Sequence, residues 1–317
     1  MNRMGRPFNG ILLLNKPSGI TSHDAVSEVR KIIRQRRVGH TGTLDPRATG
    51  LLVVCVGRAT KIAQFLSDMD KTYEARIYLG MKSRTFDAEG VDEMQQPMPV
   101  PDLNPDVINA LLSNYIGVIK QKVPVYSAVR VQGQRLYKMA RSGNEIEPPE
   151  REIEIKQIEL LEYKKPEMAI RVTCSKGTYI RTLANDIGER LECGAYLSQL
   201  KRISVGHLNI RNAYDFEDVR VAHEQNNLHT ILLRYQQVLN YPAFRITDEF
   251  KPFVISGKDP QRSDIVGVHG KFKAGDRIVL RDSLGRNLAV GTAEIDSDKL
   301  DEVEPGTKFF DYVRVLN

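Results

Sequence analysis

A twelve-residue segment, GHTGTLDPRATG (residues 39–50), places the strongest limit on how this chain can fold. It follows a segment with helical periodicity, DAVSEVRKIIRQRR, and it leads into the apolar run LLVVCVG. Three glycines and one proline inside it exclude a continuous helix or strand. The segment therefore predicts a helix–loop–strand unit whose tightly turned loop carries a single acidic residue, Asp45.

Asp45 is the only acidic residue between Glu28 and Asp68, and Pro46 biases its backbone toward an extended conformation. In most Asp-Pro pairs the aspartate belongs to a turn and its carboxylate bonds the local backbone. The alternative is a carboxylate presented to a ligand, which is ionised at neutral pH and can act as a base or nucleophile. The residues of the loop alone leave both interpretations open.

Hydrophobic periodicity predicts the elements on both sides of this loop. Thr21 and Asp24 fit a capping box at the start of a helix that we expect to end at Gly39. A clear helical stripe begins near Tyr179, directly after a strand that runs into Gly177. The other expected elements are strands at residues 11–14, 51–56, 71–80, 151–160 and 168–175 and a helix at residues 104–114.

The pattern changes near Tyr241. From there the chain offers the short strand-like runs FVISG, DRIVL, NLAVGTAEI and YVRVL, separated by glycine and aspartate turns. A chain of 317 residues also favours two domains. We therefore expect a mixed α/β (α+β) domain with a largely antiparallel sheet over residues 1–240, and a small all-β domain over residues 241–317.

The charge distribution favours a polyanionic partner. The net charge is +6, and residues 1–75 hold twelve lysines and arginines against six acids. Residues 120–142 hold six further basic residues, no acid, and the tyrosines Tyr126 and Tyr137. Basic residues interleaved with aromatic rings suit RNA with unstacked bases, although a solvated basic surface gives the same pattern. The tract from residue 123 to residue 149 lacks periodicity, which is typical of a functional or mobile loop.

Other features of the sequence exclude several functional classes. The six histidines show no metal-ligand spacing, and no phosphate-binding loop, dinucleotide fingerprint or G-x-S-x-G motif occurs. No apolar run reaches the length of a membrane helix, and the start of the chain lacks a signal-peptide core. The three widely spaced cysteines predict no disulfide framework and favour a reducing cytoplasm.

Six segments together closely resemble the TruB family of tRNA pseudouridine synthases. They occur in the order found in the family and span nearly all of residues 9–206. The end of the chain is similar, more diffusely, to a PUA domain, an RNA-binding β-module. The segments are GILLLNKPSGITSHDAVSEVR, RVGHTGTLDPRATGLLVVCVGRATK, KTYEARIYLG, VPVYSAVRVQGQRLYKMARSG, KGTYIRTLANDIG and GAYLSQLKRISVG.

The resemblance implies a role for the residues that carry chemistry. Asp45 corresponds to the catalytic aspartate, and Arg181 pairs with it and orients it. Tyr73 stacks on the target base after that base has flipped out of the RNA.

The resemblance also implies which residues bind the substrate. His40 lies by the flipped nucleotide and helps to hold the rearranged RNA loop, while Tyr179 and Leu200 line the uracil pocket. The tract at about residues 120–150 corresponds to the mobile thumb that closes on the RNA.

The expected function is therefore conversion of uridine 55 in the T loop of tRNA to pseudouridine, without a metal or redox cofactor. The expected partner is the tRNA T arm, and the expected enzyme is a cytoplasmic monomer that requires no protein partner. One alternative is a synthase that depends on a guide RNA within a protein complex. Another is a non-catalytic RNA-binding or tRNA-folding protein. A nuclease or glycosidase would need a metal site or a second positioned carboxylate, and the sequence shows neither.

Overall fold

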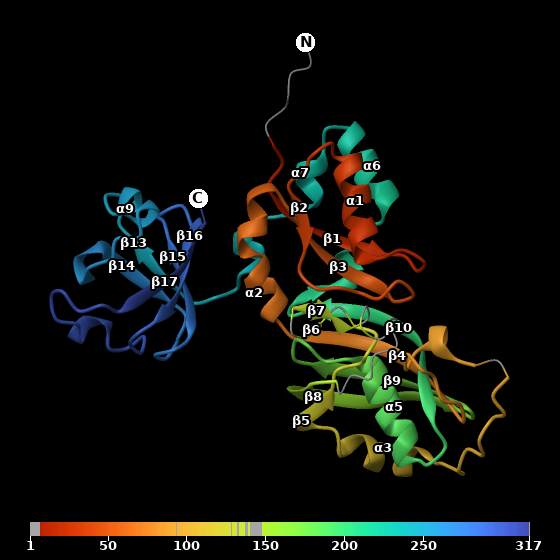
Figure 1. Cartoon of the computed structure of the whole chain (residues 1–317). Coiled ribbons are helices and arrows are strands. Elements are labelled where there is room, and N and C mark those ends of the chain that lie inside the picture. The colour runs from red at the N-terminus through yellow and green to blue at the C-terminus, as the bar shows by residue number, and fades with distance from the viewer. Residues whose placement is uncertain are drawn as a thin grey trace.

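The computed structural model describes residues 7–92, 94–127, 129–131, 133–136, 139 and 148–316 (Figure 1). Within these residues, ten strands form one sheet. They are β1 (Gly10–Lys16), β2 (Val38–His40), β3 (Thr49–Val56), β4 (Lys71–Leu79), β5 (Gly117–Lys122), β8 (Glu150–Lys164), β9 (Glu167–Cys174), β10 (Ala195–Val205), β11 (Leu208–Asn209) and β12 (Leu232–Leu233).

The order of these strands brings distant parts of the chain together. The main path runs β12-β1-β3-β10-β4-β9-β8-β5, with β2 beside β3 and β11 beside β10. Every one of these pairs is antiparallel except β3 and β10, which are parallel. The expectation of a mixed, largely antiparallel sheet is therefore confirmed, and β10 lies between β3 and β4 at its centre.

Helices cover this sheet in separate groups. The helices of this part are α1 (Ser22–Ile32), α2 (Ala63–Asp68), α3 (Pro105–Ser113), α5 (Ile180–Arg190), α6 (Phe216–Glu224), α7 (Leu228–Ile231) and α8 (Tyr235–Val238). One core cluster joins α1, α6 and α7 to β1 and β3, and a second joins α3 and α5 to β4, β8, β9 and β10. The second cluster sets the start of α5 against the centre of the sheet (Figure 1).

The capping box at the start of α1 is confirmed, since Thr21 and Asp24 bond each other's backbone N–H. The expected end of that helix at Gly39 is wrong. The helix ends at Ile32 because Arg34 adopts a left-handed conformation with φ 52°, which a helix cannot continue through. Gly39 instead lies inside the short strand β2.

A second sheet is formed by the end of the chain. Its order is β14 (Ile265–His269), β13 (Ala243–Ile246), β15 (Arg277–Arg281), β16 (Asn287–Ala293) and β17 (Phe310–Val315). The strand expected over FVISG is wrong, because α9 (Lys251–Ile255) takes up most of that run. Pro252 lies in the first turn of α9, where a missing N–H costs nothing.

The two sheets share apolar packing. One core cluster contains Ile11 and Leu51 from the first sheet together with Val279, Val290 and Leu316 from the second part of the chain. The rings of Phe65 and Tyr241 also meet edge to face across this junction, with their centroids 6.5 Å apart. The C-terminal sheet is therefore held against the larger part by a continuous apolar contact.

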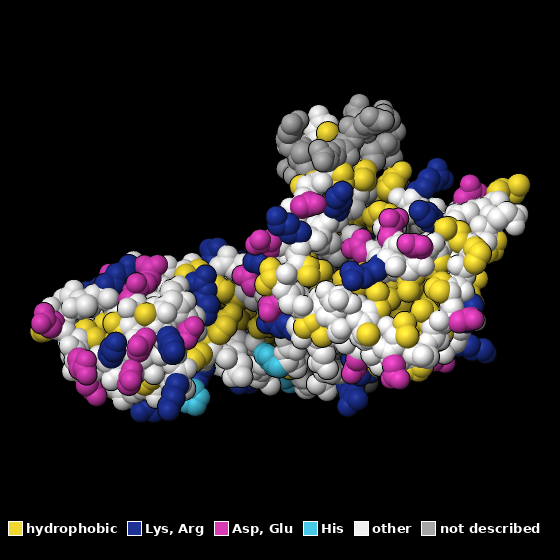
Figure 2. Space-filling model, turned by 90° about the horizontal axis from the view of Figure 1, so that it is seen from below, with side chains coloured by type: hydrophobic (Ala, Val, Ile, Leu, Met, Phe, Trp, Pro, Cys, Tyr) yellow, Lys and Arg dark blue, Asp and Glu magenta, His cyan; other side chains and the backbone are white. Residues whose placement is uncertain are grey.

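The outer surface carries mixed charges. On the face shown in Figure 2, lysines and arginines alternate with acids, and exposed apolar side chains gather over the larger part of the molecule. That face is not the uniformly basic surface that the charge distribution along the sequence suggests. Among the described residues, no helix combines the length and apolar character needed to cross a membrane.

Candidate active site

The loop between β2 and β3 is fixed from below by two buried cations. The ammonium of Lys16 donates to the carbonyls of Pro17 and Ile20 at 2.8 Å and to that of Pro46 at 3.2 Å. Lys16 is fully buried, and burial lowers its pKa, while the nearby carboxylate of Asp45 acts in the opposite direction. The ammonium therefore anchors the loop one residue beyond the candidate aspartate.

Arg202 on β10 is the second of these cations, and it is 2% exposed. Its guanidinium donates to the carbonyl of Leu51 at 2.7 Å and to that of Gly42 at 3.1 Å. Gly50 makes this approach possible: its φ is 100°, and a Cβ there would lie 2.3 Å from the carbonyl oxygen of Arg202. The parallel contact of β3 with β10 therefore requires glycine at position 50.

Asp45 presents its carboxylate instead of using it in the turn. The turn bond comes from the backbone, where the Ala48 N–H donates to the Asp45 carbonyl at 3.0 Å. The carboxylate pairs with Arg181, with 3.8 Å between Oδ2 and Nε, and the Asp45 side chain stays 46% exposed. That separation exceeds a hydrogen bond, so the carboxylate oxygens remain available to a ligand.

Arg181 lies in the first turn of α5 and contacts three separate segments. Besides Asp45, it faces Asp87, with 3.6 Å between Nη1 and Oδ2, and its Nη2 donates to the Tyr126 carbonyl at 2.9 Å. Its side chain is only 8% exposed. A buried guanidinium with these contacts is fixed in position and keeps a negative charge close to Asp45 favourable.

Asp87 is itself held in a defined orientation. Its Oδ1 accepts hydrogen bonds from the Thr85 hydroxyl at 2.5 Å and from the Glu89 N–H at 3.0 Å. The other oxygen, Oδ2, is thereby left to face Arg181. The guanidinium therefore lies between two carboxylates, one held from behind and one open to solvent.

Tyr73 lies on β4, where it is the direct neighbour of Arg202 on β10. Burial raises the pKa of the Tyr73 phenol, while the positive charge of Arg202 acts against this and the charge of Asp45 adds to it. The electrostatic influence of Asp45 and Arg202 places the phenol beside the loop. Leu200, two residues before Arg202, packs with Tyr73 against the core formed with α5.

Tyr179 precedes α5 as its N-cap residue. Its backbone exchanges two hydrogen bonds with the buried amide of Gln121 on β5, at 2.8 and 3.0 Å. The Arg181 guanidinium carbon lies 5.7 Å from the centre of the Tyr179 ring, within the range of a cation–π contact. The start of α5 is therefore tied to the strand that leads into the tract at residues 120–150.

His40 ends β2 and faces the same loop. Its Nδ1 accepts a hydrogen bond from the Gly42 N–H at 3.3 Å, so that nitrogen carries no proton. Burial and the positive charge of Arg202 both lower the pKa of His40. The ring is therefore neutral at physiological pH and can donate only through Nε2.

The tract at about residues 120–150 is described only in part. It contains β5 up to Lys122 and the short hairpin of β6 (Arg130–Val131) and β7 (Gln134–Arg135). Tyr137, Lys138 and Arg141, which the sequence marks as RNA-binding candidates, lie outside the described residues. Tyr126 lies within them and reaches the site through its carbonyl.

The sequence analysis missed Lys16, Asp87 and Arg202. Lys16 and Arg202 act on backbone carbonyls, and Asp87 acts on a side chain far along the chain. A signal did exist for Arg202, which is a cation on a strand whose other residues alternate between polar and apolar. In the part of the chain that the structure describes, no group of three or more histidine, cysteine, aspartate or glutamate side chains could hold a metal ion.

The domain composition matches three family models in succession. A model of the TruB family pseudouridylate synthase N-terminal domain covers residues 30–180. A model of the tRNA pseudouridylate synthase B C-terminal domain covers residues 181–239, and a PUA domain model covers residues 242–316. The three matches together account for nearly all of the chain after residue 30.

Two solved structures share the fold over 97% of this chain and 85% of their own, each with a TM-score of 0.77. One is an H/ACA RNP bound to a substrate RNA containing 2'-deoxyuridine, at 25% identity, and the other is a Cbf5-Nop10-Gar1 complex, at 26%.

Similar proteins in bacteria carry the name tRNA pseudouridine synthase B. One from Bacillus licheniformis is 39% identical over 292 residues, which are 89% of this chain and 92% of that protein. One from Staphylococcus aureus is 40% identical over 258 residues, which are 79% and 85% of the two chains. With relatives this similar over most of its length, the chain belongs to the TruB family of pseudouridylate synthases.

Proposed function

We propose that this protein converts uridine 55 in the T loop of tRNA to pseudouridine, with Asp45 as the catalytic carboxylate. One observation carries the assignment: a half-exposed aspartate is aimed by a buried arginine, in a loop whose glycines allow RNA to approach closely. The names of the bacterial relatives support the substrate and the reaction.

The reaction is an isomerisation, so nothing is added to the RNA or removed from it. The bond between N1 of uracil and C1' of the ribose breaks, and a bond from C5 to C1' forms. The hydrogen on C5 is lost, and N1 gains a proton. A carboxylate next to the sugar and the base can serve this exchange, and Arg181 keeps it charged and aimed.

The remaining site residues are assigned to substrate binding. Flipping a uridine out of its stack costs a few kcal/mol, which the ring of Tyr73 offsets by stacking on the flipped base. Tyr179 and Leu200 line the uracil pocket. The neutral His40 donates through Nε2 to the rearranged RNA loop.

The partner, the location and the division of the chain are parts of the same proposal. The enzyme acts as a cytoplasmic monomer on the tRNA T arm, with neither a protein partner nor a cofactor. Residues 1–240 form its catalytic domain, with the thumb at about residues 120–150, and residues 241–317 form its PUA domain. The separate second sheet and the PUA match at residues 242–316 support that boundary.

The test is mass spectrometry of T-arm RNA after treatment with a pseudouridine-specific reagent. Wild-type protein should form the product on naked tRNA, and Asp45→Asn should form none while it still binds the RNA. Asp68→Asn serves as the control, because Asp68 forms an exposed ion pair with Lys176 at 2.6 Å, and it should keep wild-type activity. A wild-type protein that binds naked tRNA but forms no product would support the guide-dependent or purely RNA-folding alternative.

A further inference from the structure

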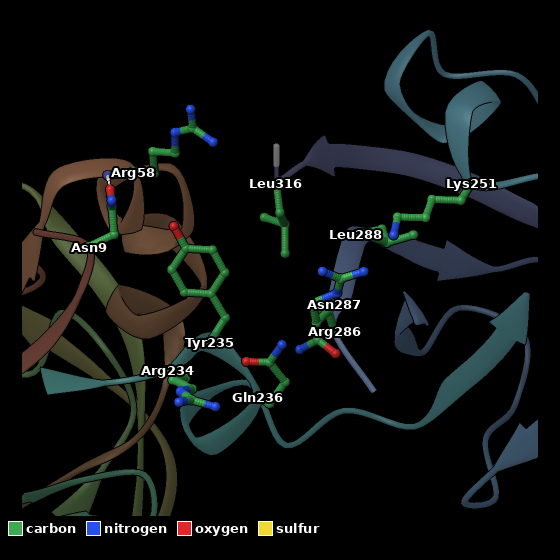
Figure 3. A pocket seen from close by; sticks show the side chains of 10 residues that line it. All are labelled: Asn9, Arg58, Arg234, Tyr235, Gln236, Lys251, Arg286, Asn287, Leu288 and Leu316. Carbon is green, nitrogen blue, oxygen red and sulfur yellow. Dashed lines mark hydrogen bonds between the residues drawn. The ribbon is translucent and has the colours of Figure 1, made fainter. Parts of the chain in front are cut away.

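A cleft of about 380 Å³ lies between the larger part of the molecule and the C-terminal sheet. Arg58, Arg234 and Tyr235 line it from one side, and Lys251, Arg286 and Asn287 line it from the other (Figure 3). Every charged residue that lines it is a cation, and none of the residues placed around Asp45 takes part. The volume lies within the range of small-ligand sites.

The cleft has more positive charge than its own acids neutralise. Asp282, which is fully buried, pairs with Arg286 at 2.7 Å and with Lys251 at 3.3 Å. Among the described residues, no carboxylate forms an ion pair with Arg58 or Arg234, and both of these side chains are exposed. Two guanidinium groups therefore remain free to bind a phosphate.

A buried donor is also left without a partner there. Asn287 is 5% exposed, and its Oδ1 accepts a hydrogen bond from the Arg281 guanidinium at 3.0 Å, which fixes the orientation of the amide. Its Nδ2 has no hydrogen-bond partner. A buried N–H that stays unpaired costs about 1–3 kcal/mol, so this donor indicates an acceptor on a bound molecule.

The remaining lining suits a flat ring. Tyr235 is half-buried, and its phenol lies close enough to Arg58 for that charge to influence its pKa. Leu288 and Leu316 complete an apolar wall on the opposite side. Aromatic rings beside cations are the common surface for stacking bases of single-stranded RNA.

We propose that this cleft binds a nucleotide: Arg58 and Arg234 hold the phosphate, Tyr235 faces the base, and the Nδ2 of Asn287 donates to an acceptor on the ligand. The nucleotide is either part of a tRNA strand outside the T loop or a free nucleotide. The first source rests on the proposed function, and the second does not.

The experiment compares two double variants of the full chain. Arg58→Ala/Arg234→Ala removes the two free cations of the cleft, and both side chains are exposed, so the fold is retained. Arg220→Ala/Lys299→Ala removes two exposed cations elsewhere. Calorimetric titrations with UMP and with inorganic phosphate test the free ligand. Titrations with full-length tRNA and with an isolated T-arm hairpin, at several salt concentrations, test the strand.

A free-nucleotide site predicts that the cleft variant binds UMP at least tenfold more weakly than the control does, with tRNA binding unchanged. A strand site predicts weaker binding of full-length tRNA, a salt dependence lower by about one per lost phosphate contact, and unchanged hairpin binding. The proposal is overturned if the cleft and control variants behave alike with every probe, or if hairpin and full-length tRNA weaken equally. Absence of pseudouridine formation by the wild type would instead refute the proposed function.

Discussion

Replacing Arg181 by lysine keeps the positive charge but removes the planar fork that reaches Asp45, Asp87 and the Tyr126 carbonyl. A single ammonium can satisfy only one of these three partners. Each contact to a charged group in such a setting is worth about 1.5–3 kcal/mol. If only the aim of Asp45 is lost, this energy corresponds to a rate roughly 10- to 150-fold lower.

The assay is single-turnover pseudouridine formation on a T-arm hairpin, with RNA affinity measured on the same samples. We expect the rate to fall within that range while the affinity changes less than threefold. Arg171→Lys is the matched control, because Arg171 also bridges two carboxylates, Glu74 at 2.8 Å and Glu159 at 2.7 Å, on the exposed face of the sheet. A wild-type rate in Arg181→Lys, or a loss confined to RNA affinity, would refute the reasoning.

Three further predictions concern the support of the loop. Gly50→Ala places a methyl group against the backbone of Arg202 at positive φ and should lower the free energy of unfolding by about 2–5 kcal/mol, whereas Gly19→Ala, with open space around it, should cost about 1–2 kcal/mol in urea titrations. Lys16→Met should leave buried carbonyls without a donor, at about 1–3 kcal/mol each, and lower stability and activity together; a variant that loses neither contradicts the anchoring role. Burial lowers the pKa of Lys71 from 10.5 to about 8, so between those pH values the unfolded chain binds more protons and the free energy of unfolding should rise with pH. That rise should be smaller in Lys71→Met, and an equal rise in the variant would exclude Lys71 as its source.

Local patterns predicted the local structure well. The capping box at Thr21, the buried strand at residues 51–56 and the helix that follows Tyr179 all form as their residue spacing indicates. The two wrong elements, the helix end at Gly39 and the strand at FVISG, lie where a single residue decides the outcome. A left-handed Arg34 stops the first helix, and Pro252 starts a helical turn in an otherwise strand-like run.

The site could be predicted only for residues within recognisable motifs. The structure brings Asp45, Tyr73, Tyr179 and Arg181 together, although their catalytic and binding roles stay predictions. Arg202 could not be predicted as a support of the loop, since its partner Leu51 lies 151 residues away along the chain. Such a contact depends on the order of strands in the sheet, which no local spacing encodes.

The parallel pair of β3 and β10 also has a consequence for the order in which the protein is made. The loop that carries Asp45 is complete early in synthesis, but β10 and its Arg202 emerge from the ribosome about 150 residues later. Until then β3 has an open edge, and the carbonyls of Gly42 and Leu51 have only water as a donor. A nascent chain therefore contains the aspartate long before it has an active site, and chemistry on RNA must wait until the sheet closes around it.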